Sequence, residues 1–330
     1  MDREVFGKDT ETDVVKERVF SQPTVGQFGN EIANAKTRDL DTNRRSKRAN
    51  WREIPKIDAN VHLGTDELVD FYKNRDDDEI WKYSDLEIIK GQMEKYNVKK
   101  VILQPTNDGY MYYDMPQVNQ WLSDVVAQNK DILKAFADIQ NNGSYFIDIT
   151  PSLLEKAILS NGLSGLMVNP SSLAIDIDDL SMVPVLRKAA ELEIPVMVQS
   201  YPSMVGSFRA GDPDKINRMI KVFPDINFIT ACLGGMKWKD ALNGVTYVDI
   251  SYVLPKFVEI YGIEGTNRIL RAFGADRLIF GTNYPNVYKT HALDVYEKYL
   301  SILEMMDFTQ EEAEKIAYGN ISKIMGIKLG

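Results

Sequence analysis

The chain has 330 residues, of which 44% are hydrophobic and 26% charged, as is usual for a globular protein with a full apolar core. Its formal net charge of −9 disfavours nonspecific binding to nucleic acid or to an anionic membrane surface. The one cysteine, Cys232, excludes an intramolecular disulfide and is typical of a reducing compartment. The sequence contains neither a membrane-length apolar run nor the apolar segment of a secretory signal. We therefore expect a cytoplasmic protein that binds neither nucleic acid nor membranes.

Residues 1–50 differ in character from the rest of the chain, because they are polar and contain no strand-like apolar run. Their basic cluster at residues 44–48 is preceded by interspersed acidic residues, which favours a solvated arm over a nucleic-acid contact. A short helix around residues 29–37 is expected to pack on the folded domain or on a second subunit. The sequence thus predicts a polar N-terminal arm, residues 1–50, and one folded domain, residues 51–330.

From residue 54 onward, short apolar runs alternate with segments of helical period. The apolar runs are rich in Val, Ile and Phe and show little polar alternation, as expected for parallel strands that are buried on both faces. The eight predicted strands are residues 54–61, 100–104, 133–139, 165–169, 195–199, 227–232, 246–250 and 277–282.

Helical periodicity fills the intervals between these strands and continues after the last one. The predicted helices are residues 84–96, 116–129, 151–159, 182–192, 213–222, 255–273, 292–306 and 309–325. Several begin at proline, which suits a first helical turn. Ser84 with Glu87, and Thr309 with Glu312, have the spacing of a capping box.

Eight strands with intervening helices predict a single (β/α)8 TIM barrel of the α/β class, with extra C-terminal helices. An open, doubly wound sheet is the alternative. It is disfavoured because no Gly-x-Gly-x-x-Gly turn follows the first strand.

The ends of the predicted strands carry polar side chains, and in such a barrel the chemistry lies at these ends. The strand-end residues are Asn60, His62, Gln104, Asp138, Asn169, Gln199, Cys232, Ser251 and Asn283. Most of them are amides, which donate and accept hydrogen bonds but do not take up a proton near neutral pH. The chain has only two histidines, His62 and His291, so it cannot build a zinc site from several imidazoles.

Several segments resemble the amidohydrolase superfamily, in the amidohydrolase-related branch. That branch contains metal-dependent hydrolases, aromatic-acid decarboxylases and a pyrone-dicarboxylate lactonase. The matching segments are IDANVHLG at 57–64, IPVMVQ at 194–199, FPDINFI at 223–229, ACLGG at 231–235, FGADRLIFGTNYP at 273–285 and GN at 319–320. They occur in family order over residues 54–326, and the resemblance implies a barrel with a metal-dependent active site at its mouth.

The chain departs from the family at the positions that the resemblance makes functional. The family has histidine where Asn60, Gln199 and Cys232 stand. It has a metal-binding, proton-accepting aspartate at the position of Asn283, and His62 alone keeps the family residue. Amide oxygens are weak ligands for a transition metal, and an amide cannot accept a proton from water. We therefore expect no bound metal, no other cofactor and negligible activity by the family's ordinary route.

Three interpretations of function remain open on the sequence. The favoured one is a degenerate, metal-free site that binds a small polar or carboxylate ligand at the barrel mouth. The second is a non-catalytic partner or regulatory subunit of an active homologous enzyme. The third is a hydrolase or decarboxylase that uses Cys232 as nucleophile and His62 as its base. A homo-oligomer is compatible with each.

The predicted site residues follow from these interpretations. The catalytic candidates are His62 and Cys232, and the substrate-binding candidates are Asn60, Asn169, Gln199, Arg209, Asn283 and Tyr284. Arg209 stands in the loop after the fifth strand, where it could hold a carboxylate through two hydrogen bonds. The aromatic residues at 110–113 could line the pocket or pack on another subunit. A lone cysteine at the end of a buried strand is more often an apolar filler.

Overall fold

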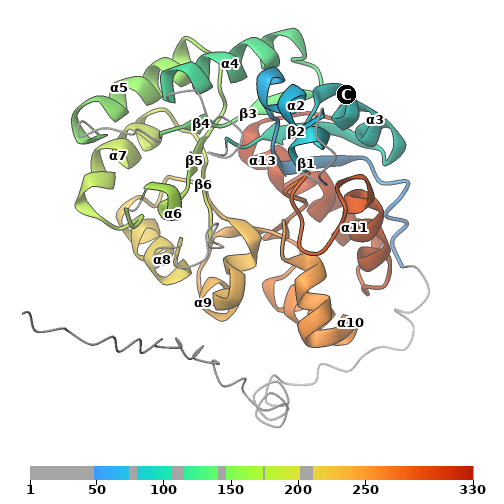
Figure 1. Cartoon of the computed structure of the whole chain (residues 1–330). Helices are drawn as coiled ribbons and strands as arrows, with labels where there is room; N and C mark the ends of the chain where they lie inside the picture. Colours follow the sequence, from blue (N-terminus) through green and yellow to red (C-terminus); the bar gives the residue numbers. More distant parts are fainter. Residues whose placement is uncertain are drawn as a thin grey trace, which may run out of the picture. The chain divides into compact units, whose positions relative to one another are not determined.

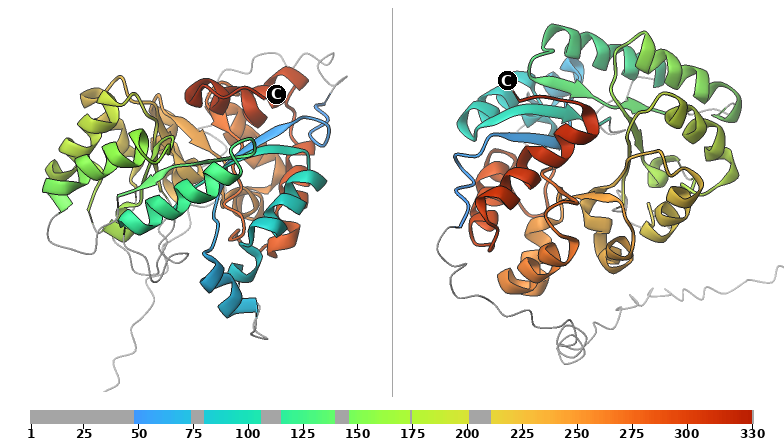
Figure 2. Two further views of the ribbon diagram at one scale, coloured as in Figure 1. Left: turned by 90° about the horizontal axis from the view of Figure 1, so that it is seen from above. Right: turned by 180° about the vertical axis from the view of Figure 1, so that it is seen from behind.

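The computed structural model describes residues 48–73, 80–105, 115–139, 146–173, 175–200 and 211–329. Within these residues the predicted (β/α)8 architecture is confirmed. Figure 1 shows the strands at the centre of a ring of helices, and Figure 2 shows the same ring from behind and from above. The N-terminal arm, and with it the helix expected around residues 29–37, lies outside the described residues.

The strands agree with the eight predicted runs, and every assigned pair is parallel. They are β1 Lys56–Val61, β2 Val98–Leu103, β3 Leu133–Ala135, β4 Ala137–Asp138, β5 Leu166–Val168, β6 Val196–Val198, β7 Phe228–Thr230, β8 Tyr247–Asp249 and β9 Leu278–Ile279. One predicted strand is divided at Phe136 into β3 and β4. The order of hydrogen-bonded strands is β1-β2-β3 in one sheet and β4-β5-β6-β7-β8-β9 in the other.

The first strand meets the segment around the last strand through separate backbone hydrogen bonds rather than through a continuous ladder. The amide of Ala59 donates to the carbonyl oxygen of Phe280 at 3.0 Å, and the amide of Asn283 donates to the carbonyl oxygen of Asn60 at 2.7 Å. A further bond joins the amide of His62 to the carbonyl oxygen of Tyr284 at 2.8 Å. These contacts place the two ends of the barrel sequence side by side.

The helices follow the strands in the predicted alternation. They are α2 Asp66–Lys73, α3 Leu86–Lys95, α4 Met115–Gln128, α5 Phe146–Leu159, α6 Pro170–Leu173, α7 Val183–Glu191, α8 Pro213–Val222, α9 Trp238–Asn243, α10 Leu254–Phe273, α11 Val295–Glu304, α12 Gln310–Glu314 and α13 Asn320–Met325. Short 3-10 segments, η2 Ile80–Tyr83 and η6 Ala292–Asp294, precede α3 and α11. Helices α2, α6 and α9 are not predicted by the sequence, because segments of four to eight residues are too short to show a helical period.

Two helix starts test the capping boxes that the sequence predicts. Thr309 and Glu312 form the predicted capping box, with each side chain bonded to the other residue's backbone N–H. The box predicted at Ser84 is wrong by one residue. The carboxylate of Asp85 caps α3 by accepting from the amides of Glu87 and Ile88, while the hydroxyl of Ser84 donates to the carbonyl oxygen of Trp81. Ser and Asp are equally good N-caps, so adjacent candidates cannot be ranked from sequence.

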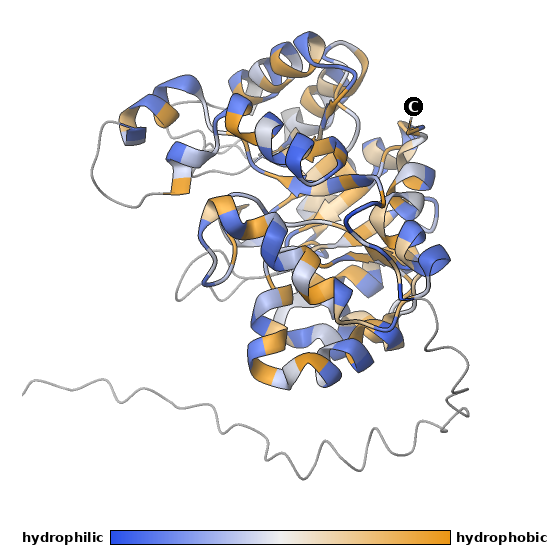
Figure 3. Cartoon of the chain, turned by 90° about the vertical axis from the view of Figure 1, so that its right-hand side faces the viewer, coloured by the Kyte–Doolittle hydropathy of each residue, from blue (hydrophilic) through white to orange (hydrophobic). Residues whose placement is uncertain are grey.

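The strands carry the apolar core of the barrel. Leu103, Leu166, Val198 and Ile229 are all fully buried within it. Figure 3 shows hydrophobic residues concentrated on the central strands, with hydrophilic residues on the outward sides of the helices. The apolar core therefore fixes the strand positions, and the polar residues at the strand ends form the site.

Candidate active site

Polar side chains at or after the ends of β1, β8 and β9 meet inside the barrel. Asn60, Asp249 and Ser251 are fully buried, whereas His62 and Asn283 keep 7% and 6% of their surface exposed. Asn60 stands near the end of β1, and His62 follows its last residue, Val61. The site is therefore layered, with Asn60 and Asp249 in the deeper layer and His62 nearer to the surface.

The ring of His62 lies between two oxygen atoms. Its Nδ1 is 2.9 Å from the backbone oxygen of Gln104, and its Nε2 is 3.1 Å from Oδ1 of Asn283. A backbone oxygen only accepts, so Nδ1 carries a hydrogen. Asn283 cannot present its NH2 group to the ring instead, because its Nδ2 donates to the backbone oxygen of Asn286 at 2.7 Å. Both hydrogen bonds are made when both ring nitrogens carry hydrogen, that is, when His62 is an imidazolium.

The backbone of Asn283 explains why an amide suits this position. Its φ is 67°, in the left-handed region that asparagine enters more readily than most residues. The side chain bonds to a backbone oxygen three residues ahead, and its own oxygen faces His62. Asn283 therefore orients the imidazole while holding its own strained turn.

Asp249 is the centre of the deeper layer. Its Oδ1 accepts from the amide of Cys232 at 2.6 Å, from the amide of Ser251 at 3.1 Å and from the hydroxyl of Ser251 at 2.6 Å. Its Oδ2 accepts from Nδ2 of Asn60 at 3.1 Å. Burial raises the pKa of Asp249 above its ordinary value, and these hydrogen bonds oppose the shift. The carboxylate ties together the ends of β1, β7 and β8.

The thiol of Cys232 is not placed as a nucleophile requires. Its Sγ donates to Oε1 of Gln199 at 3.3 Å and lies 3.5 Å from Oγ of Ser251. Burial, and secondarily the charge of Asp249, raise the pKa of Cys232 well above its ordinary value, whereas a reactive cysteine needs it lowered. This geometry gives the Cys232–His62 pair no support, since Cys232 is bonded to other residues and its thiolate form is disfavoured.

The other predicted ligand contacts are placed in different surroundings. Gln199 and Asn169 are half-buried at the ends of β6 and β5. Tyr284 is fully buried, and its hydroxyl donates to the backbone oxygen of Tyr83 at 2.9 Å. Arg209 and the aromatic residues at 110–113 lie outside the described residues. As substrate contacts, all of these remain predictions.

The sequence reasoning missed the two carboxylates that are most deeply buried, Asp249 and Asp58. Oδ1 of Asp58 accepts from the amides of Asn60 and Thr282, and its Oδ2 accepts from the hydroxyls of Thr282 and Tyr296. The sequence signal that could have found them is an aspartate inside an apolar strand run. A carboxylate is seldom buried at such a position unless hydrogen bonds or a functional role compensate for its lost hydration. Both aspartates were missed because only the residues at the strand ends were considered as site candidates.

The family resemblance implies a metal site at the barrel mouth. In the part of the chain that the structure describes, carboxylate, imidazole or thiol groups converge in threes only at Asp212, Asp214 and Asp240, around α8 and α9. The site in the barrel offers one imidazole, a thiol with a raised pKa, amide oxygens and the carboxylate of Asp249, whose oxygens already accept four hydrogen bonds. A divalent transition metal prefers several imidazole, thiolate or carboxylate ligands together. These residues do not fit the family's metal.

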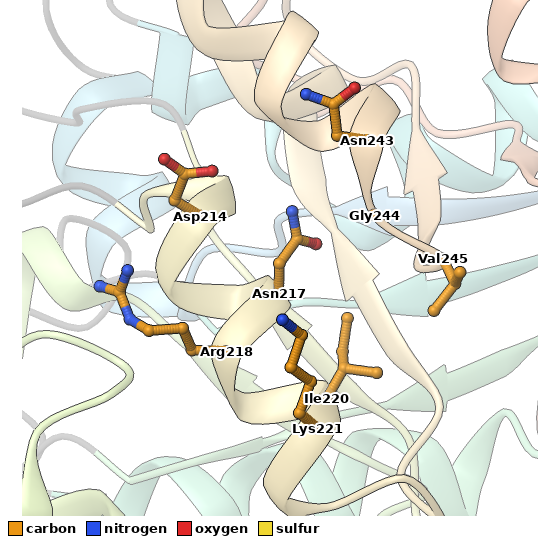
Figure 4. A pocket seen from close by; sticks show the side chains of 8 residues that line it. All are labelled: Asp214, Asn217, Arg218, Ile220, Lys221, Asn243, Gly244 and Val245. Carbon is orange, nitrogen blue, oxygen red and sulfur yellow. The ribbon is translucent and has the colours of Figure 1, made fainter.

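A surface hollow of about 410 Å³ lies apart from the strand ends, beside α8 and the segment after α9. Figure 4 shows Asp214, Asn217, Arg218 and Lys221 along the helix, with Asn243 and Val245 opposite. Arg218 is already paired with Asp178 at 2.6 Å. The hollow is open, and its ionic groups are mostly exposed, so it carries no assignment.

The sequence profile of the amidohydrolase family matches residues 90–327, and the chain therefore belongs to this family. The matched region includes all the strand ends discussed above except those of β1. A search of curated proteins gives no significant match. In the described part of the chain, no helix combines the length and apolar character needed to cross a bilayer.

Solved structures confirm the fold at low sequence identity. A 2,6-dihydroxybenzoate decarboxylase from Rhizobium has a TM-score of 0.60 and 15% identity, covering 82% of this chain and 98% of its own. A 5-carboxyvanillate decarboxylase from Novosphingobium aromaticivorans, solved with bound manganese, has a TM-score of 0.63 and 14% identity, with coverages of 85% and 99%. A 4-oxalomesaconate hydratase from Rhodopseudomonas palustris has a TM-score of 0.57 and 18% identity, with coverages of 82% and 95%.

These comparisons correct the favoured interpretation of the sequence. The expectation of a degenerate, metal-free protein without ordinary activity finds no support in the comparisons, because the solved structures with this fold include named decarboxylases and a hydratase, one of them with bound manganese. The interpretation as a non-catalytic partner subunit fails with it. The error came from inferring loss of activity from missing ligands, although a substituted barrel mouth can still position other reactive groups.

Proposed function

We propose that the chain is a lyase that removes carbon dioxide from a small carboxylic acid at the barrel mouth, with His62 as the proton donor. One observation carries this proposal: both ring nitrogens of His62 face fixed carbonyl oxygens, an arrangement that suits an imidazolium. Membership of the amidohydrolase family and the likeness to decarboxylases support the same class of reaction. The lone cysteine favours the cytoplasm as its compartment.

Decarboxylation by this route needs a positive charge that binds the substrate carboxylate and a proton donor at the same position. A buried imidazolium attracts a substrate carboxylate strongly, because charges interact more strongly away from bulk water. When the carbon–carboxylate bond breaks, its electron pair stays on the substrate carbon and carbon dioxide leaves. The hydrogen on Nε2 of His62 then forms the new C–H bond, and His62 becomes neutral. Solvent returns one proton to the ring, so each turnover consumes one proton.

The neighbouring residues keep the donor in position. The Nδ1 hydrogen remains bonded to the backbone oxygen of Gln104 throughout, which fixes the ring. Oδ1 of Asn283 accepts the hydrogen bond from Nε2 until the substrate binds. It faces the ring because the NH2 group of Asn283 donates to the backbone oxygen of Asn286. Because the ring is already oriented, the proton can be transferred without a prior rotation of the imidazole.

The proposal is tested by incubating the purified full chain with 2,6-dihydroxybenzoate, 5-carboxyvanillate and related acids, and by measuring carbon dioxide release. In D2O the product should carry one deuterium at the carbon that lost carbon dioxide. His62→Gln should lower kcat by about 10² to 10⁴, the usual contribution of a positioned proton donor.

His291→Gln is the matched control, because His291 is the chain's other histidine and caps η6 instead of joining the site. It should retain the wild-type rate. Full activity in His62→Gln, or no release of carbon dioxide from any acid by a folded protein, would refute the proposal.

A further inference from the structure

We infer that Thr282 is a positioning residue for the proton donor His62, and that its buried hydroxyl acts through the backbone of Tyr284. The inference rests on the proposed function, because it concerns how His62 is held against Asn283. It arises from a hydroxyl that links the two segments carrying these side chains, at the junction where the hydrogen-bonded ladder of strands is interrupted.

His62 and Asn283 meet where β1 faces the segment after β9. These two strands belong to different sheets, so a continuous ladder does not set the spacing between them. Instead, the backbone amide of His62 donates to the carbonyl oxygen of Tyr284 at 2.8 Å. The contact of 3.1 Å between Nε2 of His62 and Oδ1 of Asn283 therefore depends on where the backbone of Tyr284 lies.

The hydroxyl of Thr282 fixes this backbone. It accepts from the backbone amide of Tyr284 at 3.1 Å and donates to Oδ2 of Asp58 at 2.6 Å. The backbone amide of Thr282 donates to the other oxygen of the same carboxylate at 3.0 Å. Thr282 thus joins the amide of Tyr284 to a buried carboxylate through two hydrogen bonds in series.

The carboxylate belongs to the strand that leads into His62. Oδ1 of Asp58 also accepts from the backbone amide of Asn60, at 3.1 Å. The hydrogen bonds therefore form a closed ring from His62 to Tyr284, then to Thr282 and Asp58, and back along β1 to His62. Asp58, Thr282 and Tyr284 are fully buried, so water does not compete for these bonds. The ring sets the separation of the two segments at the position of the proton donor.

Tyr296 provides an internal comparison. Its hydroxyl also donates to Oδ2 of Asp58, at 2.9 Å, and its side chain is fully buried like that of Thr282. The amide of Tyr284 bonds to Thr282, however, and not to Tyr296. Removing either hydroxyl takes one donor from Asp58, but only the loss of the Thr282 hydroxyl releases the amide of Tyr284. The two positions therefore separate support of a buried carboxylate from positioning of His62.

The first test compares carbon dioxide release by the full-length wild type, Thr282→Val, Thr282→Ser and Tyr296→Phe. Thr282→Val should lower kcat about 10-fold to 10²-fold, as expected when a reacting group is misplaced. Its KM should stay near the wild-type value, because the charge that attracts the substrate carboxylate is still present. Thr282→Ser restores the hydroxyl and should recover kcat, and Tyr296→Phe should keep the wild-type kcat.

The second test needs no substrate. The chain has only two histidines, so protein labelled with 15N in the imidazole rings gives few NMR signals, and His291→Gln assigns them. In wild type and Tyr296→Phe, the Nε2 hydrogen of His62 should exchange slowly with water because it is bonded to Asn283. In Thr282→Val it should exchange faster, while the Nδ1 hydrogen, bonded to Gln104, stays slow. Thr282→Ala replaces Thr282→Val in both tests if the valine variant does not fold.

The outcomes separate the two proposals. If the wild type decarboxylates no acid, the proposed function fails, and the hydrogen exchange of His62 alone decides the role of Thr282. If the wild type is active but Thr282→Val keeps the wild-type kcat and slow exchange, the proposed function stands and this inference is overturned. It is also overturned if Tyr296→Phe impairs both readouts as much as Thr282→Val, or if Thr282→Ser does not recover them.

Discussion

Asp58 shows how one buried carboxyl group can remain compatible with two protonation states. Its Oδ1 faces two amide N–H groups, from Asn60 and Thr282, and must accept from both. Its Oδ2 faces two hydroxyls, from Thr282 at 2.6 Å and Tyr296 at 2.9 Å, which can donate or accept. A proton on Oδ2 is therefore accommodated by rotating a hydroxyl. Burial raises the pKa of Asp58 to about 7, and the hydrogen bonds limit this rise.

The raised pKa predicts a pH-dependent contribution to stability. The folded state binds this proton more tightly than the unfolded state, whose value is near 3.8, so the group favours folding most at low pH. The contribution declines as the pH rises from about 4 to about 7 and is constant above that. A difference of about three pKa units corresponds to about 4 kcal/mol. The measurement is the free energy of unfolding by urea at several pH values in this range.

Asp58→Asn removes the titration while keeping hydrogen bonds to the same partners. The difference in free energy of unfolding between wild type and variant should therefore change steadily between pH 4 and pH 7. A difference that does not vary with pH would show that Asp58 keeps an ordinary pKa. A wild type that becomes more stable relative to the variant as the pH rises would show that the pKa is lowered.

At the residue scale, the sequence identifies which positions reach the site but not what they do there. Asn60, His62 and Asn283 are found because they stand at or just after the ends of predicted strands. The double hydrogen bonding of His62 depends on the amide of Asn283 bending back to Asn286, which no spacing reveals. Asp249 is missed because it stands inside a predicted strand and its contact with Asn60 joins positions 189 residues apart in the sequence.

At the element scale, the return of the chain after β6 is controlled by a glycine. The amide of Gly211 donates to the backbone oxygen of Gln199 at 2.9 Å. A Cβ at Gly211 would overlap that same oxygen and would lie 2.8 Å from Cγ1 of Val198. The close approach therefore requires a residue without a side chain.

Gly211→Ala should lower the free energy of unfolding by about 1 to 3 kcal/mol, because the backbone at the end of β6 must shift to admit the methyl group. The same shift would move Gln199, which accepts from the thiol of Cys232, so thiol reactivity should increase. Chemical denaturation and the rate of labelling by a thiol reagent measure the two effects.

Gly91→Ala is the matched control, since Gly91 lies within α3 with no atom near the position of an added Cβ. That variant should be about 0.5 to 1 kcal/mol more stable, as expected for alanine replacing glycine inside a helix. Equal effects of the two substitutions would contradict the role given to Gly211.

The elements themselves are largely predictable, for reasons that also explain the exceptions. Buried parallel strands give continuous apolar runs, so all eight are found from the sequence. The start of α5 is wrong, because the prediction begins the helix at Pro151 and the structure begins it at Phe146. Proline favours a first turn only statistically, and here it is accommodated inside the helix.

For the whole molecule, the contact between the first strand and the segment around the last is the decisive long-range feature. The amides of Ala59 and Asn283 bridge this junction, and their acceptors lie more than 200 positions away along the chain. They cannot be released without separating the two ends of the barrel. Their hydrogen exchange should therefore require global unfolding.

Hydrogen exchange followed by NMR or mass spectrometry tests this expectation. The amides of Ala59 and Asn283 should be among the slowest, and their rates should follow the free energy of unfolding as urea is added. The amide of Gly244, which bonds to Ala241 at the end of α9, should exchange faster through local fraying. Equal rates at the three positions would show that the barrel opens locally at this junction.

The fold of the whole molecule follows from the order of the family segments, whereas the function does not follow from the missing family ligands. The sequence resemblance places each strand end correctly, so the barrel is predicted and confirmed. The mistake was to infer loss of function from ligand types alone. Hydrogen bonds join Asn60, Asp249 and Ser251 into an ordered buried group that a comparison of ligand types does not capture.

The junction between Ala59 and Phe280 also has a consequence for biosynthesis. Ribosomes deliver the amino-terminal end first, so the strand bearing Asn60 and His62 emerges long before the segment that bonds to it. A nascent chain or a prematurely terminated product that lacks this segment cannot hold His62 against Asn283. The contact between His62 and Asn283 should consequently form only late in translation, and incomplete polypeptides should lack the proposed activity.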